Sequence, residues 1–175
     1  MNRIPFSEFI LQGSVIPDED GNLEPPVYQD SPFYFINKKV ILFGVPGAFT
    51  PTCSNEMLPT YDLLFDKFVK DFGIDAIYCT SVNDDYVMEA WAKSLDLKNI
   101  EMLPDGNGDF AEKMGMRVKK ECIGFGIRSW RYSCYVDDAE IKLMLEEPGK
   151  ENNLLDDPYE VSSPENMYKQ LKEML

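Results

Sequence analysis

Cys53 is the residue of this chain whose surroundings most clearly favour chemistry. It lies in the segment Val45-Pro46-Gly47-Ala48-Phe49-Thr50-Pro51-Thr52-Cys53-Ser54. The apolar run at 40–43 predicts a buried strand before this segment, and the apolar residues after it recur at helical spacing. Thr50 is a favourable N-cap residue, and Pro51 suits the first helical position. We therefore expect Cys53 in the first turn of a helix, where free amides and the helix dipole favour the nucleophilic thiolate.

Histidine is absent from the 175 residues, and its absence excludes several kinds of catalytic site. Ser-His-Asp and Cys-His arrangements are impossible, and so are zinc or haem sites with histidine ligands. An activated cysteine in this chain must depend on amides, hydroxyls and arginine. The sequence implies no metal, haem or flavin as a cofactor.

The four cysteines, Cys53, Cys79, Cys122 and Cys134, are scattered along the chain. Because no two have CxxC spacing, neither a zinc ribbon nor a thioredoxin-type dithiol motif is supported. In a reducing compartment, such cysteines are more often buried or catalytic than paired in disulfides. We expect Cys134 in the core and Cys122 in a loop.

The chain is strongly acidic, with a net charge of −14 from 31 acidic and 17 basic residues. Nucleic acids and anionic membranes need a basic patch, and the basic runs 38–39 and 117–120 are short enough to be solvated loop charges. No stretch approaches the roughly 20 apolar residues of a membrane helix. The N-terminus also lacks a signal pattern. We expect a cytoplasmic protein without nucleic-acid or membrane partners.

The rest of the chain alternates predicted strands and helices, and the length suits one domain over residues 1–175. The turn-rich residues 12–32 predict short edge strands and loops. The expected elements are then a strand at 40–46, a helix at 51–72 kinked by Pro59, a strand at 75–82, a helix capped by Asn83, a strand at 100–104, a helix at 109–115, a hairpin of 131–137 and 139–146, a polar loop at 147–161, and a last helix that starts with the capping box Ser162-Ser163-Pro164-Glu165. A parallel βαβ core followed by a hairpin and a terminal helix is typical of a thioredoxin-like α/β fold, with a mixed central sheet flanked by helices.

Several separated motifs make residues 35–165 resemble the peroxiredoxins, and in particular the peroxiredoxin-5 subfamily. That group includes the plant type II enzymes and the bacterial peroxiredoxin–glutaredoxin hybrids. The matching segments are Pro46-Gly47-Ala48-Phe49-Thr50-Pro51-Thr52-Cys53-Ser54, Ser81-Val82-Asn83-Asp84, Ala90-Trp91-Ala92, Pro104-Asp105-Gly106-Asn107-Gly108, Gly124-Phe125-Gly126-Ile127-Arg128-Ser129-Trp130-Arg131-Tyr132-Ser133 and Asp157-Pro158-Tyr159-Glu160-Val161-Ser162. The resemblance implies a thiol peroxidase that reduces hydrogen peroxide and organic hydroperoxides, with a sulfenic acid as the first product.

The resemblance also implies roles for individual residues. Cys53 matches the peroxidatic cysteine, Thr50 the threonine whose hydroxyl contacts thiolate and peroxide, and Pro46 the proline that shields the sulfur. Thr50 also suits a plain N-cap, and Pro46 also suits the end of a strand. Arg128 and Arg131 are three positions apart, so on an extended strand only one would face Cys53. The family pattern gives that catalytic role to Arg131, which leaves Arg128 as a supporting, interface or surface residue.

The way the oxidised cysteine is reduced again stays open at this level. Cys79 resembles the second cysteine of the plant enzymes, which has been assigned as a resolving partner, yet a cysteine on a predicted strand usually packs as a small hydrophobe. The late resolving cysteine of animal peroxiredoxin-5 has no counterpart in residues 152–157. The hybrids carry a glutaredoxin domain after the matching tail, so the resemblance implies a separate reductant, glutathione with glutaredoxin or thioredoxin.

Two other functions remain as alternatives to a peroxidase. One is a peroxide-sensing redox relay with slow turnover, which steady-state peroxide consumption would distinguish. The other is an inert binding module, which the joint presence of Pro46, Thr50, Cys53 and Arg131 disfavours. Members of the family commonly form dimers near the active site, so we expect a homodimer. Phe49 and Trp130 are candidates for its interface or for the core.

Overall fold

A computed structural model describes residues 2–11, 19–22 and 25–175, and the expected edge strands and loops of 12–32 fall partly outside these residues. Its elements, in chain order, are β1 (Glu8–Leu11), β2 (Val27–Asp30), α1 (Ser31–Phe35), β3 (Lys39–Val45), a π-helical turn (Cys53–Met57), α2 (Leu58–Phe72), β4 (Ala76–Ser81), α3 (Asp85–Ser94), β5 (Ile100–Pro104), α4 (Asp109–Lys113), β6 (Arg117–Lys120), a 3₁₀ turn (Glu121–Ile123), β7 (Gly126–Ser129), β8 (Tyr132–Asp137), β9 (Glu140–Glu146) and α5 (Pro164–Met174).

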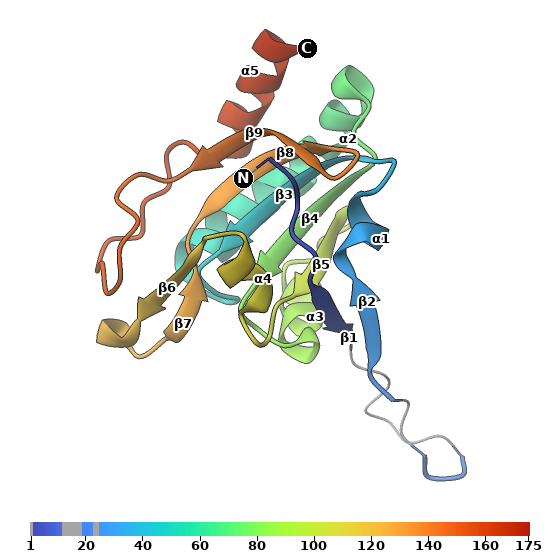
Figure 1. Ribbon diagram of the computed structural model, residues 1–175, viewed down its shortest axis with the longest axis vertical. Coiled ribbons are helices and arrows are strands. Elements are labelled where there is room, and N and C mark those ends of the chain that lie inside the picture. The colour runs from blue at the N-terminus through green and yellow to red at the C-terminus, as the bar shows by residue number, and fades with distance from the viewer. Residues whose placement is uncertain (1, 12–18, 23–24) are drawn as a thin grey trace.

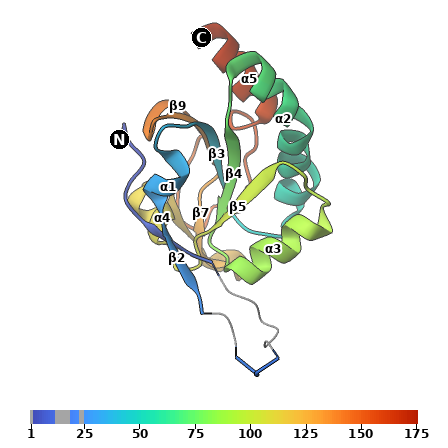
Figure 2. The ribbon, with the colours of Figure 1, turned by 90° about the vertical axis from the view of Figure 1, so that its right-hand side faces the viewer.

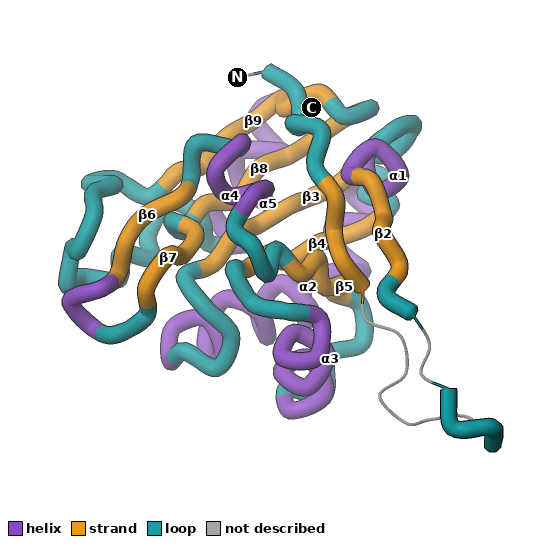
Figure 3. Tube along the Cα trace, turned by 60° about the horizontal axis from the view of Figure 1, so that its bottom comes forward, coloured by secondary structure: helices purple, strands orange, loops and turns teal. Residues whose placement is uncertain are grey.

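The central sheet has five strands in the order β5-β4-β3-β8-β9 (Figure 1). β3, β4 and β5 run parallel, whereas β8 is antiparallel to both β3 and β9. The mixed sheet that the sequence predicts is therefore present. Two small hairpins, β1–β2 and β6–β7, lie at opposite sides of this sheet (Figure 3).

The strand β3 is buried on both faces because its alternate side chains enter two different cores. Val40 and Leu42 belong to one apolar cluster, while Ile41 and Phe43 belong to the other. Helices α2, α3 and α5 cover the second cluster, and α1 and α4 cover the first (Figure 2). The result is a three-layer arrangement with β3 at its centre.

The helix after Cys53 begins irregularly. Residues Pro51 and Thr52 are α-helical, the turn Cys53–Met57 is π-helical, and α2 continues regularly from Leu58. The amide of Leu58 bonds to the carbonyl of Cys53, the wider spacing of a π-turn. Pro59, which lacks an amide proton, follows directly, so the predicted irregularity at Pro59 takes the form of a π-turn ahead of it.

Three predictions about local structure are wrong. Asp84 rather than Asn83 caps α3, since its carboxylate accepts from the amide of Val87 at 3.1 Å. Ser163, one residue later than predicted, caps α5 by accepting from the amide of Asn166. Residues 117–120 form a strand instead of a solvated loop, and they bury one lysine of the run.

The remaining elements fall close to their expected places. The turn between β8 and β9 places Asp138 and Ala139 at φ of 48° and 62°, as a tight hairpin turn requires. Within the described residues, no helix has both the length and the apolar character needed to cross a membrane.

Candidate active site

The topology of the sheet brings distant segments to one edge. Because β3 and β4 are parallel, the loop that carries Cys53 and the loop that begins at Val82 leave the sheet at the same edge. β8 is antiparallel to β3, with Tyr132 opposite Gly44, so Arg131 enters the sheet at this same edge. The site is therefore built where two parallel strands end and an antiparallel strand begins.

Arg131 and Cys53 meet in the interior of the protein. Nη1 of Arg131 lies 3.3 Å from Sγ of Cys53 and 3.6 Å from Sδ of Met57. Cys53 is fully buried, and Arg131 is 1% exposed. The residue spacing led us to expect only one of Arg128 and Arg131 beside Cys53, and the family resemblance pointed to Arg131.

Two further residues hold the guanidinium of Arg131 in place. Nη2 donates to Oδ1 of Asp157 at 2.6 Å, and Nε donates to the backbone carbonyl of Pro158 at 3.1 Å. Burial opposes the charge on Arg131, but Cys53 and Asp157 favour it, and together they hold the pKa of the guanidinium above its ordinary value. A positive charge is thus fixed beside the sulfur.

Thr50 lies at the start of the helix, as predicted. Its carbonyl accepts from the amide of Ser54 at 3.0 Å, which is the first helical hydrogen bond. Its hydroxyl donates to the carbonyl of Gly47 at 2.8 Å. A hydroxyl has one proton, so Thr50 can donate to the sulfur or to a peroxide only if this hydroxyl rotates away from Gly47.

Arg128 lies on β7 beside the loop that precedes Cys53. Its Nε donates to the carbonyl of Phe125 at 2.9 Å, and its Nη1 lies 3.4 Å from the carbonyl of Val82. A Cβ atom at Gly47 would lie 3.1 Å from Nη1 of Arg128, so the glycine allows this close approach. Arg128 therefore supports the loop.

Asn83 connects the two loops that leave the sheet at this edge. Its Oδ1 accepts from the amide of Ala48 at 3.0 Å and from Oγ of Ser81 at 2.7 Å, and Nη1 of Arg128 lies 3.5 Å away. The sequence predicts Asn83 as a helix cap, so this contact was not expected. Its position directly after β4, the strand parallel to β3, is the signal that could have identified it.

The four cysteines are all free thiols in the structure. Cys79 is buried on β4 within the same apolar cluster as Cys53. Burial raises the pKa of the Cys79 thiol well above its ordinary value, Cys53 raises it further, and Arg131 lowers it. Cys134 is buried on β8 as expected, and the exposed Cys122 donates from Sγ to the carbonyl of Asn153 at 3.3 Å.

Of the two aromatic candidates, Trp130 belongs to the core and Phe49 does not. Trp130 is buried, and its Nε1 donates to the carbonyl of Glu147 at 2.8 Å. Phe49 is 56% exposed and has a φ of 61°, a strained conformation for an aromatic residue. Its ring lies 6.4 Å from that of Trp91.

A largely apolar cavity of about 250 Å³ opens beside the loop before Cys53. It is bounded by the loop itself, the 3₁₀ turn and the segment before α5. Its lining residues are Pro46, Thr50, Pro51, Thr52, Lys120, Ile123, Phe125, Leu155 and Asp157. A small molecule in this cavity would meet Thr50 and Pro46 next to the buried sulfur.

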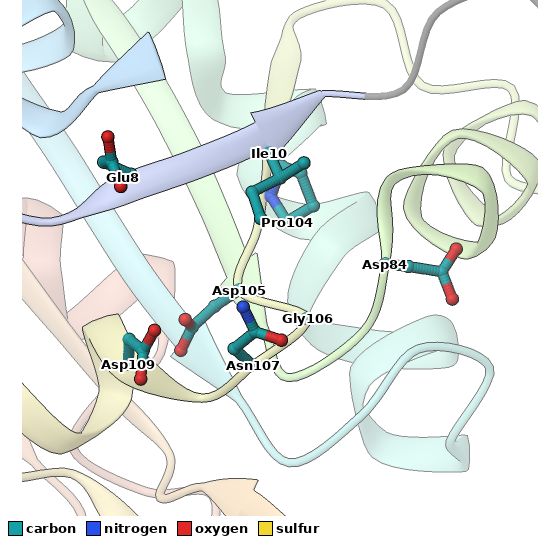
Figure 4. A pocket seen from close by; sticks show the side chains of 8 residues that line it. All are labelled: Glu8, Ile10, Asp84, Pro104, Asp105, Gly106, Asn107 and Asp109. Carbon is teal, nitrogen blue, oxygen red and sulfur yellow. The ribbon is translucent and has the colours of Figure 1, made fainter. Parts of the chain in front are cut away.

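A second cavity, of about 190 Å³, is acidic and lies between β1, the loop that joins β5 to α4, and Asp84 at the start of α3 (Figure 4). Two of its four carboxylates already accept hydrogen bonds from amides at helix starts. Asp84 caps α3, and Asp105 accepts from the amides of Phe110 and Ala111 at 2.9 and 2.8 Å. Among the described residues, no group of three or more acidic, cysteine or histidine side chains could hold a metal ion.

The redoxin family model matches residues 13–159. A peroxiredoxin of Rhizobium etli is 52% identical over 139 residues, which cover 79% of this chain and 77% of that protein. The chain belongs to the peroxiredoxins. This peroxiredoxin is also 49% identical to the hybrid peroxiredoxin hyPrx5 of Haemophilus influenzae over 78% of its own length and 55% of that protein.

The fold of this peroxiredoxin agrees with its sequence relatives. The crystal structure of the Plasmodium falciparum antioxidant protein, a 1-Cys peroxiredoxin, superposes with a TM-score of 0.89 at 35% identity, over 98% of both chains. The thioredoxin-like α/β fold predicted from the order of elements is confirmed. The protein is an enzyme, a thiol-dependent peroxidase.

Proposed function

We propose that this peroxiredoxin reduces hydrogen peroxide and organic hydroperoxides through the thiolate of Cys53. The approach of Arg131 Nη1 to Sγ of Cys53, at 3.3 Å in a buried site, is the observation that supports this proposal. A buried guanidinium stabilises the thiolate, and its remaining donors suit the oxygens of a peroxide. The adjoining apolar cavity has room for the alkyl group of an organic hydroperoxide.

The reaction is a displacement at oxygen. Sγ of Cys53 attacks one peroxide oxygen, the O–O bond breaks, and the other oxygen leaves as hydroxide or alkoxide. The sulfur is oxidised to a sulfenic acid while the leaving oxygen is reduced and takes up a proton, which gives water or an alcohol. Arg131 stabilises the developing negative charge, and Thr50 orients the peroxide once its hydroxyl turns from Gly47.

Glutathione with glutaredoxin is the proposed reductant, in a cycle that uses Cys53 alone. One glutathione displaces water from the sulfenic acid to form a mixed disulfide. A thiolate of glutaredoxin then takes the glutathionyl group and releases Cys53, and a second glutathione regenerates glutaredoxin and forms oxidised glutathione. Burial of Cys79 and its raised thiol pKa oppose its use as a resolving partner. The likeness to a hybrid peroxiredoxin also supports glutaredoxin.

Intact mass after one equivalent of hydrogen peroxide, followed by glutathione, tests this cycle. A gain of one oxygen on Cys53 that glutathione converts to an adduct is expected. Loss of two hydrogens, with Cys53 and Cys79 joined on peptide mapping, would overturn the one-cysteine cycle and favour thioredoxin. Cys53→Ser is the control and should neither gain oxygen nor consume peroxide.

A peroxide-sensing relay is the second candidate, since it would share the same first step. Steady-state peroxide consumption with glutathione and glutaredoxin separates the two functions, because a relay would consume peroxide only slowly.

We further propose a cytoplasmic homodimer in which the exposed Phe49 contributes to the interface. Light scattering of the native protein and of Phe49→Ala tests that interface.

A further inference from the structure

Residues 152–162, here called the strap, belong to the connection between β9 and α5 and carry the two oxygen acceptors of the Arg131 guanidinium. In Figure 1 the strap lies beside β6 before it returns to α5. Its middle part supplies Oδ1 of Asp157 and the carbonyl of Pro158 to the guanidinium. The geometry of Arg131 therefore depends on where the strap is held.

Lys120 holds the first half of the strap. Although it belongs to a basic run that is short enough to suggest solvated charges, it is only 3% exposed. Its Nζ donates to the carbonyl of Leu154 at 2.7 Å and to the carbonyl of Asp156 at 3.2 Å. Each strap carbonyl that flanks Leu155 is thus tied to one buried ammonium group, directly before Asp157.

Glu147 holds the second half. It is 1% exposed, and its Oε1 accepts from the amides of Glu160 and Ser162 at 2.9 and 2.8 Å and from Oγ of Ser162 at 2.6 Å. The backbone of Glu147 also contacts the catalytic segment directly, since its amide donates to the carbonyl of Arg131 at 3.2 Å. One carboxylate thus fixes the strap just after Pro158.

The two buried residues have opposite charges and lie on opposite sides of the Asp157–Pro158 pair. A buried charge is unfavourable unless it is hydrogen-bonded. Nζ of Lys120 and Oε1 of Glu147 make such bonds, all of them to the strap, whereas the buried Oε2 of Glu147 has no hydrogen-bond partner among the described residues. Such contacts leave the strap little freedom to shift. Freedom at Asp157 would let the guanidinium of Arg131 move away from the sulfur.

We propose that Lys120 and Glu147 are positioning residues for catalysis, which act through the strap to keep Arg131 on Cys53. This inference rests on the proposed function of Cys53 and Arg131. Neither residue has a hydrogen bond to Cys53 in the part of the chain that the structure describes. Their effect is transmitted through Asp157 and Pro158.

Substitutions of Lys120 and Glu147 distinguish a positioning role from a direct effect of their charges on the Cys53 thiol. Lys120→Met and Glu147→Ala should each lower kcat/KM for hydrogen peroxide about ten-fold, because each removes two or more buried hydrogen bonds of the strap. Both should also move the pH profile of Cys53 alkylation by iodoacetamide to higher pH. A direct field effect would move the two profiles in opposite directions, since one variant removes a positive and the other a negative charge.

A conservative variant of Glu147 separates the loss of its hydrogen bonds from the loss of its charge. Glu147→Gln keeps an acceptor oxygen at the same place, so its activity and alkylation profile should stay within two-fold of the wild type. A shift of its profile to lower pH would indicate a field effect and overturn the proposal. Ser31→Ala is the matched control, because it removes a buried hydroxyl that bonds to Pro5 and Ser7, away from the strap.

A double-mutant cycle tests whether Lys120 acts through Asp157. In an Asp157→Ala background, Lys120→Met should reduce kcat/KM by less than two-fold further. If the loss of kcat/KM in the double variant equalled the product of the losses in the two single variants, the proposal would be overturned. Unchanged activity in both Lys120→Met and Glu147→Ala would also overturn it. Hydrogen exchange of the strap amides should rise in Lys120→Met, and this readout remains if a Glu147 variant fails to fold.

The outcomes that would reject the proposed function differ from those that would reject the positioning role of Lys120 and Glu147. If the wild type consumed no peroxide, Cys53 would lose its proposed role, yet the alkylation profiles and hydrogen exchange would still report on the strap. Unchanged profiles and unchanged exchange in an active enzyme would instead reject the positioning role alone.

Discussion

Nη1 of Arg131 lies 3.3 Å from Sγ of Cys53, although 78 residues separate the two along the chain. The antiparallel pairing of β8 with β3, which sets Tyr132 opposite Gly44, brings them to one edge of the sheet. Because both side chains are buried, the charge of the guanidinium is poorly screened by water. Activity at Cys53 should therefore be sensitive to this pair and to the groups that hold it.

Replacing the guanidinium by an ammonium group should severely reduce activity. Arg131→Lys keeps a positive charge but loses the planar set of donors that reaches Cys53, Asp157 and Pro158 together. We expect kcat/KM for hydrogen peroxide to fall about 100-fold, the scale of removing one positioned donor from a reacting oxygen. Stopped-flow measurement of peroxide consumption checks this.

Arg128→Lys is the comparison for that variant. Arg128 supports the loop through carbonyls of Phe125 and Val82, so its loss should reduce the rate less than about ten-fold. Equal losses in the two variants would contradict the separate roles that we assign to the two arginines.

Removing the side chain of Asn83 should loosen the loop that leads to Cys53. Asn83→Ala leaves the amide of Ala48 and the hydroxyl of Ser81 without their acceptor. We expect the free energy of unfolding to fall by about 1–2 kcal/mol and peroxide consumption to slow several-fold. Chemical denaturation and peroxide kinetics give the two values.

Asn83→Asp provides the control for this prediction, since its Oδ1 can still accept from both groups. It should recover most of the lost stability. If Asn83→Asp were as unstable as Asn83→Ala, the hydrogen bonds of Oδ1 would not be the source of the effect.

Cys79 should be dispensable for the chemistry. Cys79→Ala removes a buried sulfur atom and leaves a small cavity in the apolar cluster, so we expect a loss of about 1 kcal/mol in the free energy of unfolding. Turnover with glutathione and glutaredoxin should stay within two-fold of the wild type. Loss of turnover, with a normal first oxidation of Cys53, would instead assign a resolving role to Cys79.

Asp105 should make the protein less stable as the pH rises through weakly acidic values. Burial raises the pKa of Asp105 to about 6 from an ordinary 3.8, against the amide hydrogen bonds from Ala111 and Phe110 that favour its charge. The folded protein then binds this proton more tightly than the unfolded chain does. Stability from Asp105 is therefore greatest below pH 3.8 and is lost as the pH rises to about 6.

The measurement compares Asp105→Asn with the wild type by denaturation at several pH values. The difference between the two free energies of unfolding should change by up to about 3 kcal/mol between pH 4 and pH 7. The change should favour the wild type at the lower pH. A difference that does not vary with pH would contradict the raised pKa.

The sequence by itself identified the chemistry and the order of the elements. An apolar strand, Thr50 at a helix start and Cys53 in the first turn are local features, and local backbone preferences determine them. The order of strands and helices was enough to predict a mixed sheet of the thioredoxin-like type. The odd spacing of Arg128 and Arg131 gave the expectation that only one of them reaches Cys53, although Arg131 lies just outside strands β7 and β8.

Tertiary structure alone decided which polar groups hold the loop before Cys53 and the strap. Asn83 looked like a helix cap and Lys120 looked like a solvated charge, because the nearest sequence neighbours suggest nothing else. Their real partners, Ala48 for Asn83 and the carbonyls of Leu154 and Asp156 for Lys120, are between 34 and 36 residues away. Pairing over such distances is fixed by strand register and by packing of the whole chain, so local sequence patterns cannot predict it.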